Sequence, residues 1–238
     1  MRTKLFAILF VLLSSCGHQP DNLPIKTYII YDEPVKGYRV TGVFYPFGTD
    51  SETGQIELRF KPVKGGQTLV FSNVGQHEEE YPDRPMKFSG KNIFDMVFDE
   101  NGYADKTFEG FKNGETYHWH YHGTQNEYWA HSPLLYNAEF QFYDVDFDGE
   151  DELLINSYDQ RQTGNYYNVY EITSKGLVLK KEKPFDDINN DTEFHPETRT
   201  IVYWSSFYYG EKIGFTISKD GERVIKVFNI GLAYNIDK

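Results

Sequence analysis

Apolar and polar residues alternate with a period of two through most of this chain. Successive side chains of a β-strand point to opposite faces of a sheet, so this alternation is typical of strands with one buried face. No window after the amino-terminal segment shows the 3.6-residue period of a helix. The runs with this alternation are residues 27–31, 39–45, 56–60, 68–71, 94–98, 116–122, 139–143, 152–156, 166–172, 200–204, 213–217 and 224–228.

Turn-forming residues separate several of these runs. Short polar segments that end in glycine are typical of hairpin connections. Tyr and Phe, with 19 residues each, suit the pleated, half-buried surface of a strand better than a helix. The pattern therefore predicts an all-β fold: an antiparallel meander arranged as a sandwich or a propeller-like body. The expected hairpin turns are residues 100–102, 112–114, 174–176 and 219–221.

The amino terminus is expected to be an export signal. Arg2 and Lys4 precede an apolar run at residues 5–13, and this run is too short to span a bilayer as a mature helix. The ending Leu-Ser-Ser-Cys resembles a bacterial lipobox, which implies lipidation of Cys16, the single cysteine of the chain. The alternative is an ordinary signal with a chance cysteine. We expect a signal peptide at 1–15, a tether at 16–25, and a lipid anchor to the membrane of the bacterial cell envelope.

Net charge narrows the range of partners. The chain carries −12 at pH 7, and loss of Arg2 and Lys4 with the signal would bring it to −14. An acidic domain repels nucleic acid and anionic lipid head groups, so nucleic acid is not expected as a partner. A polar, proline-bearing segment at 76–85 suggests an amino-terminal β portion at 26–90 and a carboxy-terminal β portion at 91–238, either separate or packed as one body.

An acidic loop at residues 144–152 predicts a structural Ca²⁺ site. It has carboxylates at loop positions 1, 3, 5 and 9 and a glycine at position 6, and a hard cation needs several oxygens aimed at one point around a sharp turn. It is not an EF-hand, because position 12 is Ile155 and the flanks are predicted strands. The alternative is a solvated acidic turn without metal. The expected ligands are the side chains of Asp144, Asp146, Asp148 and Glu152 and the main-chain carbonyl of Glu150.

The loop also resembles known families. With the apolar run that follows it, it resembles the aspartate-rich loops of FG-GAP and VCBS repeats. Over about residues 138–230 the chain is similar to a family of periplasmic lipoproteins first described in xanthomonads. The resemblance implies a calcium-stabilised, propeller-like fold and inhibition of lysozyme-type, peptidoglycan-cleaving effectors. The motifs that carry it are residues 146–149, 166–170, 193–201, 208–211 and 213–217.

Three alternating histidines offer a different hypothesis. His118, His120 and His122 would lie on one face of a strand, where imidazoles can bind zinc for a hydrolase. Same-face neighbours stand about 6.6 Å apart, so the outer two lie about 13 Å apart and cannot share one ion without a bend. No nucleophile elbow and no phosphate loop is present in the sequence, and we predict no catalytic residues. The leading expectation is a non-catalytic lipoprotein that binds another protein, with a cell-wall hydrolase as the suspected partner; the alternatives are a surface glycan-binding lipoprotein and this metal-dependent hydrolase.

Overall fold

The computed structural model describes residues 27–31, 33–47, 53–76, 88–89, 116–119, 132–134, 138–161, 164–206 and 211–231. Over these residues the chain is all-β, which confirms the predicted fold class, and its one helical element is a 3₁₀ turn at η1 (Phe185–Asp187). No helix among them is long and apolar enough to cross a membrane. The signal segment with Cys16, the expected strand at 94–98, the turns at 100–102 and 112–114, and His120 and His122 lie outside the described residues.

The first sheet is built mainly from the amino-terminal portion. Its strands run β4-β3-β2-β1-β6, with β5 also paired to β3. Neighbours are antiparallel except β1 and β6, which pair in parallel, with Ile30 opposite His118. Strand β6 thus brings a segment of the 91–238 portion into the first sheet. The strands are β1 (Thr27–Tyr31), β2 (Tyr38–Pro46), β3 (Thr53–Pro62), β4 (Leu69–Ser72), β5 (Phe88–Ser89) and β6 (Thr116–Trp119).

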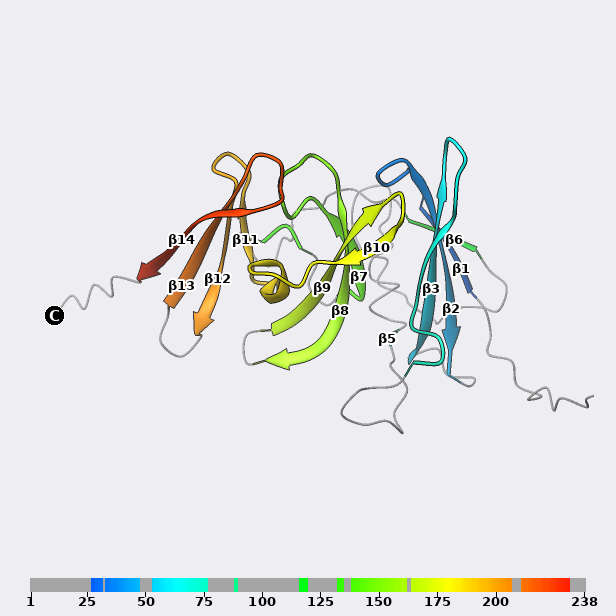
Figure 1. Ribbon diagram of the computed structural model, residues 1–238. Coiled ribbons are helices and arrows are strands. Elements are labelled where there is room, and N and C mark those ends of the chain that lie inside the picture. The colour runs from blue at the N-terminus through cyan, green and yellow to red at the C-terminus, as the bar shows by residue number, and fades with distance from the viewer. Residues whose placement is uncertain are drawn as a thin grey trace, which may run out of the picture.

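The second and third sheets are four-stranded antiparallel meanders, ordered β10-β9-β8-β7 and β11-β12-β13-β14. The predicted turns at 174–176 and 219–221 connect β9 to β10 and β13 to β14. Figure 1 shows the three sheets following one another across the molecule in chain order. Their strands are β7 (Phe140–Tyr143), β8 (Glu152–Arg161), β9 (Gly164–Thr173), β10 (Gly176–Leu179), β11 (Glu193–His195), β12 (Thr200–Ser206), β13 (Glu211–Ile217) and β14 (Val224–Gly231).

The middle sheet is buried on both faces. On β8, Leu153 and Ile155 point into a core shared with the first sheet, while Leu154 points into a second core shared with the third sheet. Aromatic edges join the layers: Tyr31 and Phe142 meet with ring centroids 5.1 Å apart in the first core. Because side chains alternate along a strand, a continuous apolar run is what a strand between two layers requires. The same alternation decides where the acidic loop points its last carboxylate.

Candidate functional site

The acidic loop connects β7 to β8 at the side of the middle sheet that faces the third sheet. Glu152 is the first residue of β8 and pairs with Tyr143, the last residue of β7. It shares a strand face with Leu154, which lies fully buried in the second core. The carboxylate of Glu152 is therefore carried into the interior and is 0% exposed. A buried carboxylate needs either a partner or a proton, because transfer of a charge from water into protein is costly unless it is paired or neutralised.

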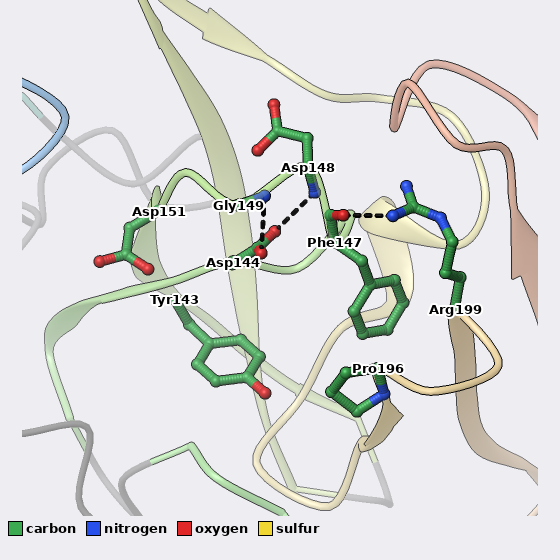
Figure 2. A pocket seen from close by; sticks show the side chains of 8 residues that line it. All are labelled: Tyr143, Asp144, Phe147, Asp148, Gly149, Asp151, Pro196 and Arg199. Carbon is green, nitrogen blue, oxygen red and sulfur yellow. Dashed lines mark hydrogen bonds between the residues drawn. The ribbon is translucent and has the colours of Figure 1, made fainter.

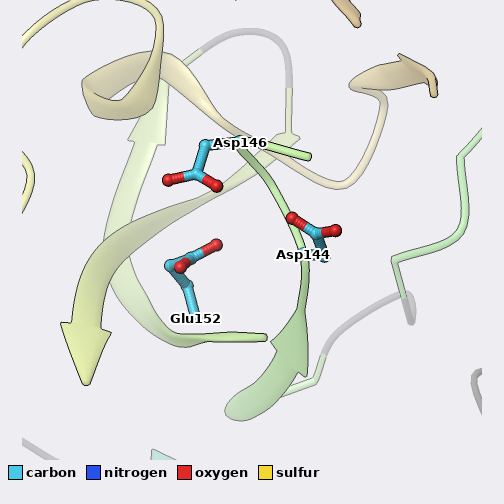
Figure 3. A group of neighbouring side chains, drawn as sticks. All are labelled: Asp144, Asp146 and Glu152. Atoms are coloured by element: carbon cyan, nitrogen blue, oxygen red, sulfur yellow. The ribbon is translucent and has the colours of Figure 1, made fainter. Parts of the chain in front are cut away.

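Three of the predicted ligand residues converge. Asp144, Asp146 and Glu152 each offer a carboxylate oxygen, and these oxygens all lie within 4.8 Å of one another. Figure 3 shows the three side chains grouped where β7 ends and β8 begins. Asp144 is half-buried, and Asp146 is only 3% exposed. Among the described residues this is the one group of three or more histidine, cysteine or acidic side chains with metal-binding spacing.

The other two predicted ligand residues place their side chains elsewhere. The Asp148 side chain is exposed, directed away from Asp144 in Figure 2, and accepts a hydrogen bond from the amide of Glu150 at 2.8 Å. The Glu150 side chain is 56% exposed and lies 3.1 Å from Nζ of Lys36, which comes from the turn between β1 and β2. The main-chain role expected for Glu150 stays a prediction. The Asp148 side chain is not part of the converged group.

The loop backbone is folded tightly around Asp144. Its carboxylate accepts hydrogen bonds from the amides of Asp148 at 3.1 Å and Gly149 at 2.9 Å. Phe147 and Gly149 have φ angles of 62° and 94°, the left-handed region in which glycine is favoured. The glycine at loop position 6 thus permits the turn that the sequence pattern predicted.

Glu152 is the group with the strongest need for a cation. One carboxylate oxygen accepts a hydrogen bond from the amide of Val145 at 3.1 Å. The other, Oε1, is buried and has no hydrogen-bond partner among the described residues. Burial, reinforced by the nearby negative charge of Asp146, raises the pKa of Glu152 to about 8. Such an orphaned oxygen beside two further carboxylates fits a hard divalent cation, which takes oxygen ligands.

A lysine from the middle sheet contacts the cluster. The ammonium of Lys180, just after β10, pairs with the carboxylate of Asp146, and its side chain is 10% exposed. Burial opposes its charge, but the hydrogen bond and charge of Asp146, together with the charge of Glu152, outweigh burial and raise the pKa of Lys180. It is therefore a buried cation at neutral pH. Burial also raises the pKa of Asp146, against the pull of Lys180.

The third sheet reaches the loop through two turns. Arg199, between β11 and β12, donates hydrogen bonds to the main-chain carbonyls of Asp146 at 3.0 Å and of Phe147, and to that of Ser218. Gly221, between β13 and β14, lies so close that a Cβ atom there would come within 2.8 Å of the Asp146 carboxylate. Sequence reasoning missed Lys180, Arg199 and Gly221, although Gly221 lies in the predicted turn at 219–221 and Arg199 in the motif at 193–201.

An open pocket of about 540 Å³ lies on the outer side of the loop, and Figure 2 shows its lining. Asp144 belongs both to this lining and to the buried cluster. Aromatic and acidic side chains form the walls, while the Arg199 guanidinium is engaged by main-chain carbonyls. The lining residues are Tyr143, Asp144, Phe147, Asp148, Gly149, Asp151, Pro196 and Arg199.

The fold and the site together define an all-β protein of three stacked sheets whose middle sheet carries a buried carboxylate cluster. Comparison of the chain with protein-family models, with curated proteins and with solved structures finds no match. Of the three histidines in the zinc hypothesis, His118 lies in β6, where its backbone pairs with Ile30. Its side chain is not among those described. The zinc hypothesis stays a prediction.

Proposed function

We propose that this chain is a calcium-stabilised, non-catalytic binding protein of the bacterial cell envelope. One observation carries the proposal: a fully buried glutamate, with one oxygen that has no hydrogen-bond partner in the described part of the chain, lies beside two aspartates in a loop of calcium-binding pattern. Three carboxylates so close repel one another unless a cation lies between them. Lys180 offsets one of the three negative charges. Two remain, and a divalent cation neutralises two.

Asp144, Asp146 and Glu152 would hold the Ca²⁺, and the metal would supply charge neutralisation and a cross-link between the loop ends. Calcium takes six to eight oxygens, so main-chain carbonyls and water would complete the set. The loop also contacts side chains from the first and third sheets through Lys36 and Arg199. The metal therefore serves the fold by fixing the loop at which the sheets meet, and no reaction step is assigned to it.

A pair of matched variants tests the calcium site. Asp146→Asn and Asp148→Asn make the same change, one in the converged cluster and one on the exposed side chain. We expect the melting temperature of the wild-type chain to rise in calcium, because a ligand that binds only the folded state stabilises it by about 2.7 kcal/mol at a hundredfold excess over Kd. Asp146→Asn should lose this rise and Asp148→Asn should keep it. Equal wild-type melting temperatures in calcium and in chelator contradict the proposal.

The anchor and the partner need separate experiments. Cys16→Ser should move the protein from the membrane fraction to the soluble fraction; unchanged partitioning refutes the lipoprotein assignment.

For the partner, the net negative charge and the carboxylates of the open pocket favour a basic protein, and the family resemblance implies a peptidoglycan hydrolase. Capture from envelope extract in calcium and in chelator should recover such a hydrolase. Recovery of glycan alone favours the surface glycan-binding alternative, and stoichiometric zinc in place of calcium favours the hydrolase alternative.

A further inference from the structure

We infer that Lys180 is a built-in counter-cation that competes with the metal ion for Asp146 and so sets the affinity and charge preference of the site. This inference rests on the proposed calcium site and adds the residue that tunes it. The key observation is that the cluster already holds one positive charge in the structure. The Lys180 ammonium pairs with the carboxylate of Asp146, which is expected to bind metal. It also interacts electrostatically with a second carboxylate, that of Glu152.

The position of this ammonium is fixed by its surroundings. The Lys180 amide donates a hydrogen bond to the carbonyl of Val169 at 2.9 Å, which ties its backbone to β9. Its Nζ lies 4.6 Å from the centroid of the Phe185 ring, whose negative face favours a cation. The side chain is 10% exposed, so water screens its charge poorly. A charge held in this way acts on every ion that enters the cluster.

Charge counting shows what the lysine does. Asp144, Asp146 and Glu152 carry three negative charges when ionised, and one ammonium leaves two to be offset, which matches a divalent ion. Without the ammonium the cluster would match a trivalent ion. Like charges a few ångströms apart in a poorly hydrated site repel strongly, so calcium binds against the resident ammonium and more weakly than to the carboxylates alone. Lys180 thus lowers affinity and favours divalent over trivalent ions.

The structure also provides space for Lys180 when it leaves Asp146. An open pocket of about 260 Å³ is lined by Lys180, Lys181, Phe185 and Asp186, among others, and the Asp186 carboxylate lies 3.3 Å from the ammonium of Lys183. An ammonium that leaves Asp146 can turn into this pocket and remain hydrated near another carboxylate. Separation of the ion pair therefore does not require the lysine to be buried without a partner, which would be costly.

The decisive variant is Lys180→Met, which keeps the length of the side chain and removes its charge. Lys175→Met makes the same change at an exposed lysine in the turn between β9 and β10, outside this pocket, and is the matched control. Calcium and terbium affinities of the full chain are measured by titration calorimetry for wild type and both variants. We expect Lys180→Met to bind calcium about tenfold more tightly or better and to gain still more for terbium, because repulsion grows with the charge of the ion. Lys175→Met should match wild type.

The outcomes separate this inference from the proposed function. Calcium binding to wild type with no gain, or with a loss, in a folded Lys180→Met overturns the role of Lys180 and leaves the calcium site standing. Binding by Lys180→Met but not by wild type supports the counter-cation and overturns calcium binding by the natural chain. Binding by neither overturns both. Melting in chelator is a second readout: Lys180→Met should melt lower than Lys175→Met, because the buried carboxylate of Asp146 then lacks its ion-pair partner.

Discussion

Replacement of Glu152 by glutamine should stabilise the metal-free protein and abolish its response to calcium. The pKa of Glu152 rises from 4.5 to about 8 on folding, chiefly through burial. The folded state therefore holds the proton more tightly than the unfolded state, and stability in chelator falls as pH rises from about 4.5 to 8. At pH 7, which lies about 2.5 units above the unfolded-state pKa of 4.5, the stability lost in this way is about 3 kcal/mol at 1.36 kcal/mol per unit. Glutamine has no such penalty, and a gain of this size shifts the melting temperature by about 6 to 12 °C in a domain of this length.

Thermal melts at pH 5, 7 and 8, in calcium and in chelator, test this prediction. Glu150→Gln is the control, since it removes a carboxylate from the same loop where the side chain is 56% exposed and pairs with Lys36. It should change stability by less than about 1 kcal/mol and keep the calcium response, because exposed ion pairs contribute little. Glu152→Gln should melt higher than wild type in chelator at pH 7, with a flatter pH profile, and lower than wild type in saturating calcium. A calcium shift equal to that of wild type would refute a ligand role for Glu152, and an unchanged melting temperature in chelator would refute the buried-charge argument.

Two further variants probe the contacts from the third sheet. Gly221→Ala should weaken calcium binding about tenfold or more, because its Cβ would press against the Asp146 carboxylate. Gly75→Ala is the control: Gly75 has nearly the same φ, +77° against +75°, and no atom lies within 4 Å of where its Cβ would be, so this variant reports backbone strain alone. If both lower stability equally and calcium affinity is unchanged, the contact has no part in the site. Arg199→Met should remove the hydrogen bonds to the Asp146 and Phe147 carbonyls and destabilise the chain by about 1.5 to 3 kcal/mol per charged bond lost. Denaturant unfolding measures this, and a loss below about 0.5 kcal/mol would show that the carbonyls find water instead.

Strand positions were predictable where the alternation is long enough to count. The runs at 27–31 and 213–217 match β1 and the inner part of β13, because one face of each strand is buried. Strands β5, β10 and β11 were missed. Strands β5 and β11 have two and three residues, too few for a period-two pattern, and β10 is a run of three apolar residues after a glycine, without alternation and with no buried residue. Each pairs with a longer neighbour that offers hydrogen bonds. The stacking of three sheets was also not predicted. The apolar run at Leu153, Leu154 and Ile155 was its signal, since a strand with two buried faces does not alternate.

The candidate site was predictable in its location but not in its inner arrangement. Carboxylate spacing identified the loop, yet it does not tell which side chains turn inward. Glu152 is buried because it begins a strand on the Leu154 face, and Asp148 points outward after a residue with left-handed backbone, Phe147. Lys180 and Arg199 come from elements 34 and 53 residues beyond Asp146. Only the register of the sheets brings them to the loop.

The enclosure of Asp146 by later parts of the chain has a kinetic consequence. Its carboxylate and carbonyl are contacted by Lys180, Arg199 and Gly221, so the surroundings of the cluster are complete only after the third sheet has docked on the second. Interactions that form after the folding transition state change the unfolding rate and leave the folding rate nearly untouched. If the third sheet docks after the transition state, stopped-flow measurements should show refolding at the same speed in chelator and in calcium, and unfolding that slows as calcium is added.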